Sequence, residues 1–290
     1  MTSITFLGTG TSQGIPMNGC QCEVCKSPDP RDKRLRSSAL IQYQGLSILV
    51  DAGPDFRQQM LREDVRHLDA ILLTHAHKDH TGGLDDVRSF NLLEGHPVNI
   101  YCEAYVESSL RREYAYAFAE PRYPGAPEWQ VHPIVPGVPF TLHSNALEDC
   151  LHWESGRGYY RTPADACAKA AHPETATVIP VRGWHDRIGK LSVMGYRFGP
   201  VAYMTDLASI DDTELEKLKG VQVVTVNCVK RGPHISHFSL DEAIGFFHRV
   251  GAPQSYLTHL SHMLPRHAAL DAELRAQGIR VAYDGLRIEV

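Results

Sequence analysis

The sequence has 290 residues, of which 43% are hydrophobic and 22% are charged, a composition typical of a globular protein with a substantial core. Its formal net charge of −5 argues against a general binder of nucleic acids or membrane surfaces, because such proteins present a basic face. The N-terminus has no signal-peptide pattern, and no apolar run approaches the roughly 18 to 20 residues of a membrane span. We therefore expect a cytoplasmic protein without membrane contact, folded as a single domain over residues 1–290.

The first part of the chain alternates strands with helices. Runs of β-branched and apolar residues predict the strands, and apolar residues at helical spacing predict the helices. The strands are expected over residues 3–10, 38–51 (a hairpin), 68–75 and 98–103. The helices are expected over residues 54–64, 85–95 and 104–118. Polar residues such as Asp51 and His75 stand at the ends of these strands.

Residues 120–176 show little periodicity and are rich in Pro, Gly, Ala and His, so we expect a long irregular excursion there. Regular patterns then predict strands over residues 175–185, 193–198, 200–206, 221–228 and 254–262. Helices are expected over residues 211–220, 239–251 and 265–278. Ser239 and Glu242 form a capping-box pattern, and Asp-Gly at position 284 predicts a closing hairpin over residues 279–290. Together the patterns predict two mixed sheets with helices outside them.

The stretch LLTHAHKDH places three histidines and an aspartate directly after a buried strand. On an extended segment residues two apart point the same way, so His75 and His77 can address one metal ion. If a helix begins at Asp79, the side chains of Asp79 and His80 turn toward a neighbouring position, where a second ion can bind. Imidazole and carboxylate ligands suit zinc, iron or manganese, and two ions about 3.5 to 4 Å apart can share a hydroxide. The alternative is a histidine-rich surface loop without a metal.

Four ligands from one loop do not fill two metal sites, so further ligands must come from elsewhere in the chain. The candidates are polar residues at other strand ends, namely His185, Asp206 and His259. Asp206 is the natural shared ligand because its carboxylate has two oxygens. His185 and His259 could instead be ordinary histidines at strand ends.

A second metal site is predicted by the stretch GCQCEVC. It contains three cysteines at Cys-x-Cys-x-x-Cys spacing: Cys20, Cys22 and Cys25. Three thiolates and one imidazole would complete a closed, tetrahedral structural zinc site. We favour His262 over His234 or His267 as the fourth ligand, because one turn could then carry both His259 and His262. Dithiol redox chemistry, or cysteines without a linked function, are the alternatives.

These motifs resemble the metallo-β-lactamase superfamily over nearly the whole chain. The signature THAHKDH, with His185, Asp206 and His259 later in the chain, carries the resemblance to the superfamily. The opening LGTGTSQGIPMNGCQCEVC, with RSSALI, PDFRQQ, GLDDVRSF and LTHLSH, is similar to the branch containing the cyclic phosphodiesterase of bacterial phosphonate breakdown. The resemblance implies an α/β (α+β) fold, a four-layer αββα sandwich with the active site at one edge.

The resemblance also implies how the ligands are grouped. One catalytic ion (Zn or Mn) would be bound by His75, His77, His185 and Asp206, and the other by Asp79, His80, Asp206 and His259. The structural zinc would be bound by Cys20, Cys22, Cys25 and His262. Asp51 matches the first acidic motif of the superfamily and would orient ligands by hydrogen bonding. His237 would be the general acid, with His234 as the weaker alternative; either could instead be a loop histidine near solvent.

Residues 143–176 look longer than the family pattern needs, and we expect an insertion in which a lid or a homodimer contact could be built. The insertion lies just upstream of His185. Three histidines inside it could therefore compete for the position of that ligand: His143, His152 and His172.

The sequence thus predicts a metal-dependent hydrolase, a phosphodiesterase acting on a small cyclic or nucleotide-like phosphodiester. A hydroxide bridging two ions would attack phosphorus, Asp79 would hold its proton, and His237 would protonate the leaving oxygen. The alternatives are a hydrolase of a thioester or lactone, an accessory protein of pyrroloquinoline quinone biosynthesis, and a non-catalytic zinc protein. Eight candidate ligand positions at an open edge, with the shared Asp206 counted for both ions, favour catalysis because structural zinc sites close at four. The net charge argues against RNA as the substrate.

Overall fold

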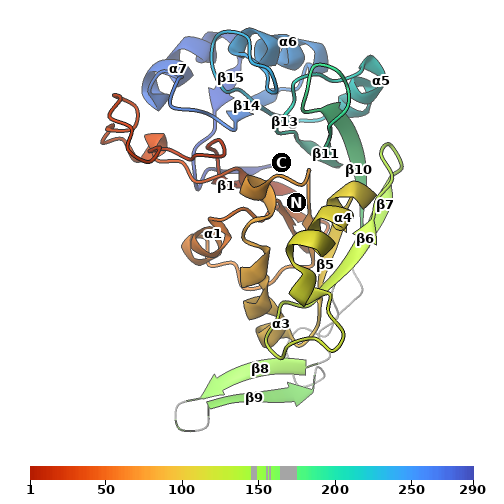
Figure 1. Cartoon of the computed structure of the whole chain (residues 1–290). Helices are drawn as coiled ribbons and strands as arrows, with labels where there is room; N and C mark the ends of the chain where they lie inside the picture. Colours follow the sequence, from red (N-terminus) through yellow and green to blue (C-terminus); the bar gives the residue numbers. More distant parts are fainter. Residues whose placement is uncertain (145–148, 155, 157, 164–174) are drawn as a thin grey trace.

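Two β-sheets form the centre of the protein (Figure 1). The structure is a computed structural model, and it describes residues 1–290 except 145–148, 155, 157 and 164–174. The first sheet has seven strands in the spatial order β16 (Arg287–Glu289), β1 (Ser3–Gly8), β2 (Ser38–Tyr43), β3 (Leu46–Val50), β4 (Ala70–Leu72), β5 (Val98–Cys102) and β6 (Trp129–Pro133). The second sheet has seven strands in the order β15 (Ile279–Val281), β14 (Gln254–Thr258), β13 (Val223–Asn227), β12 (Val201–Tyr203), β11 (Ser192–Phe198), β10 (Thr175–Trp184) and β7 (Phe140–His143).

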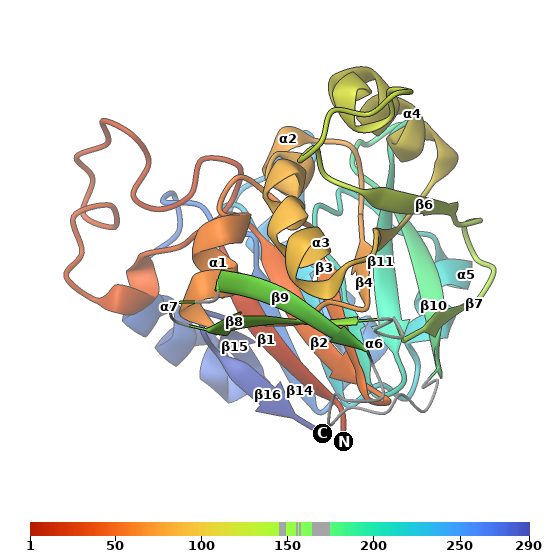
Figure 2. The ribbon, with the colours of Figure 1, turned by 90° about the horizontal axis from the view of Figure 1, so that it is seen from below.

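The inner faces of the two sheets pack against each other. Phe6 and Ile48 of the first sheet share one buried apolar cluster with Tyr196, Phe198 and Tyr203 of the second. Burial of such apolar surface is the main favourable contribution to folding. The chain ends also meet here, because the backbone N–H of Thr2 donates to the carbonyl of Val290, and Figure 2 shows the two termini side by side.

Helices cover the outer face of each sheet and complete the predicted αββα sandwich. The first sheet is covered by α1 (Phe56–Arg62), α3 (Arg88–Glu94) and α4 (Ala104–Glu113). The second sheet is covered by α5 (Asp212–Leu215), α6 (Leu240–Val250) and α7 (His267–Leu274). The predicted capping box is present at the start of α6, where Ser239 and Glu242 accept hydrogen bonds from each other's backbone N–H. Within the described ranges, no helix combines the length and the apolar character needed to cross a membrane.

The expectation of an irregular excursion over residues 120–176 is wrong. This region contains β6 and β7, the outer strands of the two sheets, and a separate hairpin of β8 (Asp149–Glu154) and β9 (Gly158–Pro163). The side chains of β6 and β7 are mostly half-buried or exposed, so they lack the apolar alternation that identifies an inner strand. Pro133 is tolerated at the end of β6 because the strand lies at a sheet edge.

The predicted closing hairpin over residues 279–290 is also wrong. Its two strands lie in different sheets: β15 pairs in parallel with β14, and β16 pairs with β1. The carboxylate of Asp284 accepts hydrogen bonds from the Leu35 N–H and the Thr9 hydroxyl, both at 2.7 Å. Gly285 follows with a φ of 89°, which a side chain would disfavour. The Asp-Gly turn therefore carries the chain from one sheet to the other.

The insertion leaves and re-enters the second sheet at one place, because His143 of β7 lies opposite Thr175 of β10. The 10 residues of β10 then span about 30 Å before His185 follows at the other end. The described part of the insertion, the β8–β9 hairpin, lies beside α3 (Figures 1 and 2). The expected lid thus gains no support from the described residues, and the homodimer contact stays a prediction. His143 lies at the root of the insertion, whereas His172 and the side chain of His152 lie outside what the structure describes.

A doubly paired histidine on the surface of the first sheet gives a pH-dependent contribution to stability. Burial lowers the pKa of His67, but hydrogen bonds to Asp69 (3.0 Å) and Glu94 (3.1 Å) outweigh burial and raise it to about 10. The unfolded chain has a pKa near 6.5 for this group, so the contribution is complete below about pH 6.5 and is lost as the pH rises through about 10. We expect His67→Gln to lower the free energy of unfolding by about 1 to 2 kcal/mol near pH 6.

Denaturant unfolding of the wild type and of the His67→Gln variant at a series of pH values measures this difference. It should shrink steadily between about pH 6.5 and 10. His248→Gln, at an exposed position of α6, is the matched control. A difference that stays constant across this range would contradict the paired imidazolium.

Candidate metal centre

Polar residues that follow five strands meet at one edge of the two sheets. They follow β3, β4, β10, β12 and β14, and they are Asp51, the His75 to His80 segment, His185, Asp206 and His259. Asp51, Asp206 and His259 have φ angles of 63°, 60° and 50°, in the left-handed region that residues other than glycine rarely adopt. Backbone strain of this kind clusters at functional sites. This edge is therefore the candidate functional site.

The first ligand set consists of three histidines. His77 keeps an extended backbone and precedes α2 (Lys78–Thr81), so His75 and His77 point the same way, as the spacing predicts. Nε2 of His75 lies 2.9 Å from Nδ1 of His77, and the ring of His185 lies 5.1 and 4.9 Å from the two rings. One nitrogen of each residue lies within 4.8 Å of the other two. The three imidazoles thus face one point.

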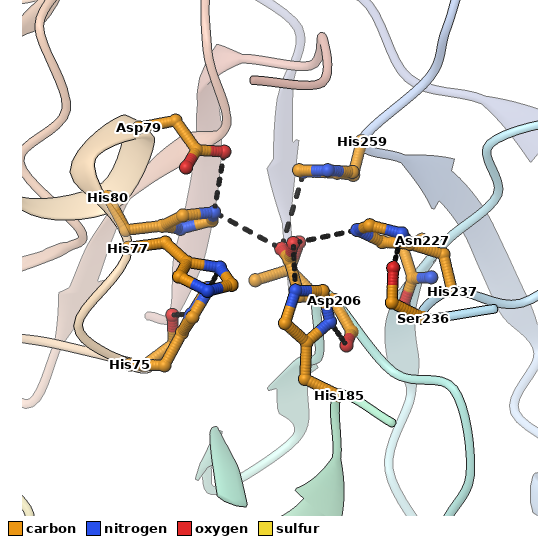
Figure 3. A network of polar contacts seen from close by, with 12 residues as sticks. His75, His77, Asp79, His80, His185, Asp206, Asn227, Ser236, His237 and His259 are labelled. Atoms are coloured by element: carbon orange, nitrogen blue, oxygen red, sulfur yellow. Dashed lines mark hydrogen bonds and ion pairs between the residues drawn. The ribbon is translucent and has the colours of Figure 1, made fainter. Parts of the chain in front are cut away.

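The second ligand set lies around Asp206, in the middle of the site (Figure 3). Its carboxylate lies 3.3 Å from Nε2 of His80 and 3.3 Å from Nδ1 of His259. Asp79 approaches the same His80 nitrogen at 3.2 Å. The carboxylate of Asp206 also lies 4.0 Å from Nε2 of His185, a member of the first set. Asp206 is therefore placed to serve both sets.

The charges of the two sets are strongly coupled. Burial raises the pKa of Asp206, but His259 and His80 outweigh it and hold this pKa well below the usual range. Burial lowers the pKa of His80, but Asp206, Asp51 and Asp79 outweigh it and raise this pKa well above the usual range. Burial and the neighbouring His80 lower the pKa of His75. The site therefore combines ionised carboxylates with closely spaced, buried imidazoles. Such a set of ligand groups suits a divalent cation.

The tautomers of three histidines also fit a metal. The Nδ1 atoms of His80, His185 and His75 lie near acceptor oxygens outside the site: a carboxylate oxygen of Asp51 at 2.7 Å, the carbonyl of Asp206 at 2.7 Å and the hydroxyl of Thr74 at 2.9 Å. A proton on each Nδ1 leaves the lone pair of each Nε2 directed into the site. Nε2 of His80 is buried, and its contacts with Asp79 and Asp206 at 3.2 and 3.3 Å are ion-pair contacts without hydrogen-bond geometry. A metal ion would satisfy this atom.

A family model described as the beta-lactamase superfamily domain matches residues 47–260. The chain belongs to the β-lactamase superfamily. The metallo-β-lactamase fold implies divalent metal ions, in agreement with the donor sets around Asp206.

The chain is similar to two solved structures and to one further relative. The crystal structure of a new diphosphatase from the PhnP family has a TM-score of 0.79 and 35% identity, covering 100% of this chain and 98% of that one. The structure of Zn²⁺-bound PqqB from Methylobacterium extorquens has a TM-score of 0.70 at 18% identity, covering 99% and 100%, and shows the fold alone. An octanoyltransferase of Porphyromonas gingivalis is 37% identical over 283 residues, which are 97% of this chain and 50% of that protein. The chain thus spans about half the length of this relative.

Asp51 lies behind the ligands, as the superfamily pattern implies. Its carboxylate accepts hydrogen bonds from the N–H and the hydroxyl of Thr74 and from His80, and it is fully buried. The Asp51 loop also packs tightly on α2, because a Cβ atom at Gly53 would lie 2.0 Å from the backbone oxygen of Asp79. Asp51 therefore orients His80 and the strand end that leads to His75.

The side chain of His237 lies next to the carboxylate of Asp206. Its Nε2 is 3.1 Å from a carboxylate oxygen of Asp206, and its ring lies 4.6 Å from that of His185. His185, Asp206 and His237 could therefore also hold an ion together. His234 lies behind His237, with its Nδ1 3.2 Å from the Nδ1 of His237. The geometry favours His237 over His234 as the residue that faces the site.

The predicted cysteine site also assembles in the superfamily fold. One donor atom from each of four residues lies within 4.8 Å of the others: Cys20, Cys22, Cys25 and His262. A backbone hydrogen bond from Cys25 and the side chain of His262 lower the pKa of the Cys22 thiol to about 6. Nδ1 of His262 lies 3.4 Å from the sulfur of Cys20. The structure brings His262 to the cysteines, while His267 contacts Arg34 and His234 lies beside His237.

Two supporting residues were missed in the sequence. The hydroxyl of Ser37 lies 3.0 Å from Nδ1 of His259, and the side chain of Asn227 pairs with the N–H and carbonyl of Leu207. Both contacts hold the backbone or ring next to a predicted ligand. Ser37 lies in the stretch RSSALI, which was used only as a family motif, and Asn227 ends a predicted strand. Neither carries a spacing signal of its own.

Proposed function

We propose that the protein is a phosphodiesterase that binds divalent ions at the two ligand sets and cleaves a small cyclic or nucleotide-like phosphodiester. The observation that carries the proposal is that the two sets are adjacent: Asp206, a member of the second set, lies 4.0 Å from Nε2 of His185 in the first set, so two ions would lie next to each other. Such ions lower the pKa of a water molecule and stabilise negative charge on phosphoryl oxygens. The diphosphatase of the PhnP family, the neighbour with 35% identity, acts on a related phosphorus centre and supports the class.

Two side chains at the edge of the site would handle protons. Burial raises the pKa of Asp79, but His80 outweighs it and keeps the carboxylate ionised, so Asp79 can accept a hydrogen bond from the attacking water. The side chain of His237 is 13% exposed, and its Nε2 faces Asp206. We assign the donation of a proton to the leaving oxygen to Nε2 of His237.

Replacing His237 with Ala tests this assignment. We expect a loss of about 10²- to 10⁴-fold in kcat/KM for methyl phenyl phosphate, because phenolate is a poor leaving group without protonation. The loss should be much smaller for methyl p-nitrophenyl phosphate, because p-nitrophenolate leaves unprotonated. His234→Ala is the matched control and should change neither rate by more than a few-fold. Equal losses for both esters would contradict proton donation by His237.

Two other functions have specific support. The PhnP-family neighbour favours hydrolysis of a diphosphate, in which the leaving group is a phosphate that needs no acid. The name of the P. gingivalis relative favours chemistry on an octanoyl thioester, which matches the thioester alternative, although the chain matches only half of that protein. The fold shared with PqqB keeps a role in pyrroloquinoline quinone synthesis as a further alternative. A panel of a phosphodiester, a nucleoside diphosphate and an octanoyl thioester separates the three hydrolytic activities.

Metal content and activity test the proposed function together. We expect about three ions per chain in the purified protein, two at the histidine and aspartate sets and one at the cysteines. Mild chelation should remove the two weaker ions together with hydrolysis of bis(p-nitrophenyl) phosphate, and added Mn²⁺ or Zn²⁺ should restore it. One tightly held ion and no turnover on any ester would instead favour a non-catalytic zinc protein.

A further inference from the structure

One arginine joins the loop of a candidate ligand to the loop of the candidate acid. Arg187 lies two residues after His185 and is partly exposed. Its guanidinium donates to the backbone carbonyl of His234 at 2.9 and 3.2 Å and to the carbonyl of His237 at 3.2 Å. The same guanidinium binds both carboxylate oxygens of Glu242, at 2.6 and 3.1 Å. A planar guanidinium can make such contacts at once, whereas an ammonium group cannot.

The loop that carries Arg187 is itself well held. The carboxylate of Asp186 accepts hydrogen bonds from the N–H groups of Ile188, Lys190 and Leu191, so the loop closes on itself. His185 fixes its start, because Nδ1 of His185 contacts the carbonyl of Asp206 at 2.7 Å. Glu242, the other partner of Arg187, belongs to the capping box at the start of α6. Arg187 therefore links two well-held parts of the chain, the loop after His185 and the start of α6.

Residues 231–237, which precede α6 and include His237, have few other hydrogen bonds to their backbone. Over the described chain, no hydrogen bond other than those of Arg187 is made to the backbone carbonyls of residues 231–237. Strand-like contacts resume only at Phe238, whose N–H donates to the carbonyl of Leu207. The ring of His237 contacts Ser236, Asp206 and Nδ1 of His234, and it stacks on the ring of His259. These contacts hold the ring, whereas Arg187 supplies the hydrogen bonds to the backbone carbonyls of His234 and His237.

We propose that Arg187 is a positioning residue that holds His237 in place for proton donation to the leaving group. The inference rests on the proposed function and adds a residue to it. Among the described residues, the side chain of Arg187 has no hydrogen bond to a member of the two ligand sets, so its effect should appear in the step that needs the acid. A displaced acid donates less well, and misplacement of a catalytic group by about 1 Å can cost up to about 10²-fold in rate.

The test compares Arg187→Ala with Lys190→Ala, which removes the same charge from an exposed position of the same loop. We expect Arg187→Ala to lower kcat/KM for methyl phenyl phosphate about 10-fold more than for methyl p-nitrophenyl phosphate. Lys190→Ala should show no such selectivity. Arg187→Lys keeps the positive charge but loses the planar guanidinium, so we expect an intermediate loss of kcat/KM for methyl phenyl phosphate. It also provides a second variant if the Ala variant folds poorly.

The double variant Arg187→Ala, His237→Ala completes a double-mutant cycle, which measures whether the two residues act together. If Arg187 acts through His237, the double variant should be no slower than His237→Ala. Three results would each overturn the proposal. They are equal losses for both esters, a lower metal content in Arg187→Ala, and losses that multiply in the double variant. A wild type that cleaves no phosphodiester would instead refute the proposed function, so the two failures are distinct.

Discussion

Asp206→Asn is expected to lower kcat/KM for bis(p-nitrophenyl) phosphate by about 10³-fold or more, with loss of both weakly held ions. Asp206 belongs to the second set and lies 4.0 Å from Nε2 of His185 in the first set, and it is 1% exposed. Asn keeps the size of the side chain and tolerates the left-handed backbone at this position, so the fold should be retained. Asp79→Asn removes a ligand of the second set only, and we expect it to lose one ion rather than two.

Metal analysis of the purified variants, alongside steady-state kinetics, measures this difference. Asp212→Asn is the matched control, because Asp212 is exposed and pairs with Arg249 at the surface. It should retain three ions and the activity of the wild type. An Asp206→Asn protein with both weak ions and normal turnover would mean that the two sets do not share this carboxylate.

The local part of the site could be predicted because short spacings decide local geometry. His75 and His77 lie two residues apart on an extended segment, and α2 turns Asp79 and His80 toward the second set. The strand ends that carry His185, Asp206 and His259 follow from apolar runs that stop at a polar residue. Since parallel strands deliver their carboxyl ends to one edge, these residues had to meet.

The contacts that support the ligands could not be predicted in the same way. Ser37 meets His259 across 222 residues of sequence, and Arg187 reaches His237 across 50. Such contacts depend on side-chain rotamers and loop paths that no periodicity records. The left-handed backbone at Asp51 could not be predicted either, because this conformation is uncommon even for Asp, although Asp is several-fold enriched in it.

The errors in the fold have a related cause. β6 and β7 lie at sheet edges, where half-exposed side chains remove the apolar alternation of an inner strand. β16 was assigned to a hairpin because Asp-Gly is the strongest local turn signal. In the fold this turn instead connects two sheets, since Asp284 binds Leu35 and Thr9. Tertiary contacts thus overrode a correct local pattern.

His262→Ala is expected to remove one tightly held ion and to lower the free energy of unfolding by about 3 to 4 kcal/mol. The cysteine loop has only a small apolar cluster of its own, formed by Ile15, Val24 and Cys25. So few apolar contacts offset little of the conformational entropy of a long loop, and a metal at the four ligands would supply further free energy. His262 joins this loop to the segment after β14, so its loss detaches the two.

Metal content and denaturant unfolding of His262→Ala test the structural site separately from catalysis. His248→Ala removes an exposed histidine from α6 and should leave both measurements unchanged. Activity of His262→Ala should fall less than that of Asp206→Asn, because His259 is held by Ser37 as well as by the loop. If His262→Ala keeps its full metal content and its unfolding midpoint, the four residues do not bind a structural ion. If instead both fall while the two weak ions and part of the activity remain, the cysteine site stabilises the fold and the histidine and aspartate sets perform the chemistry.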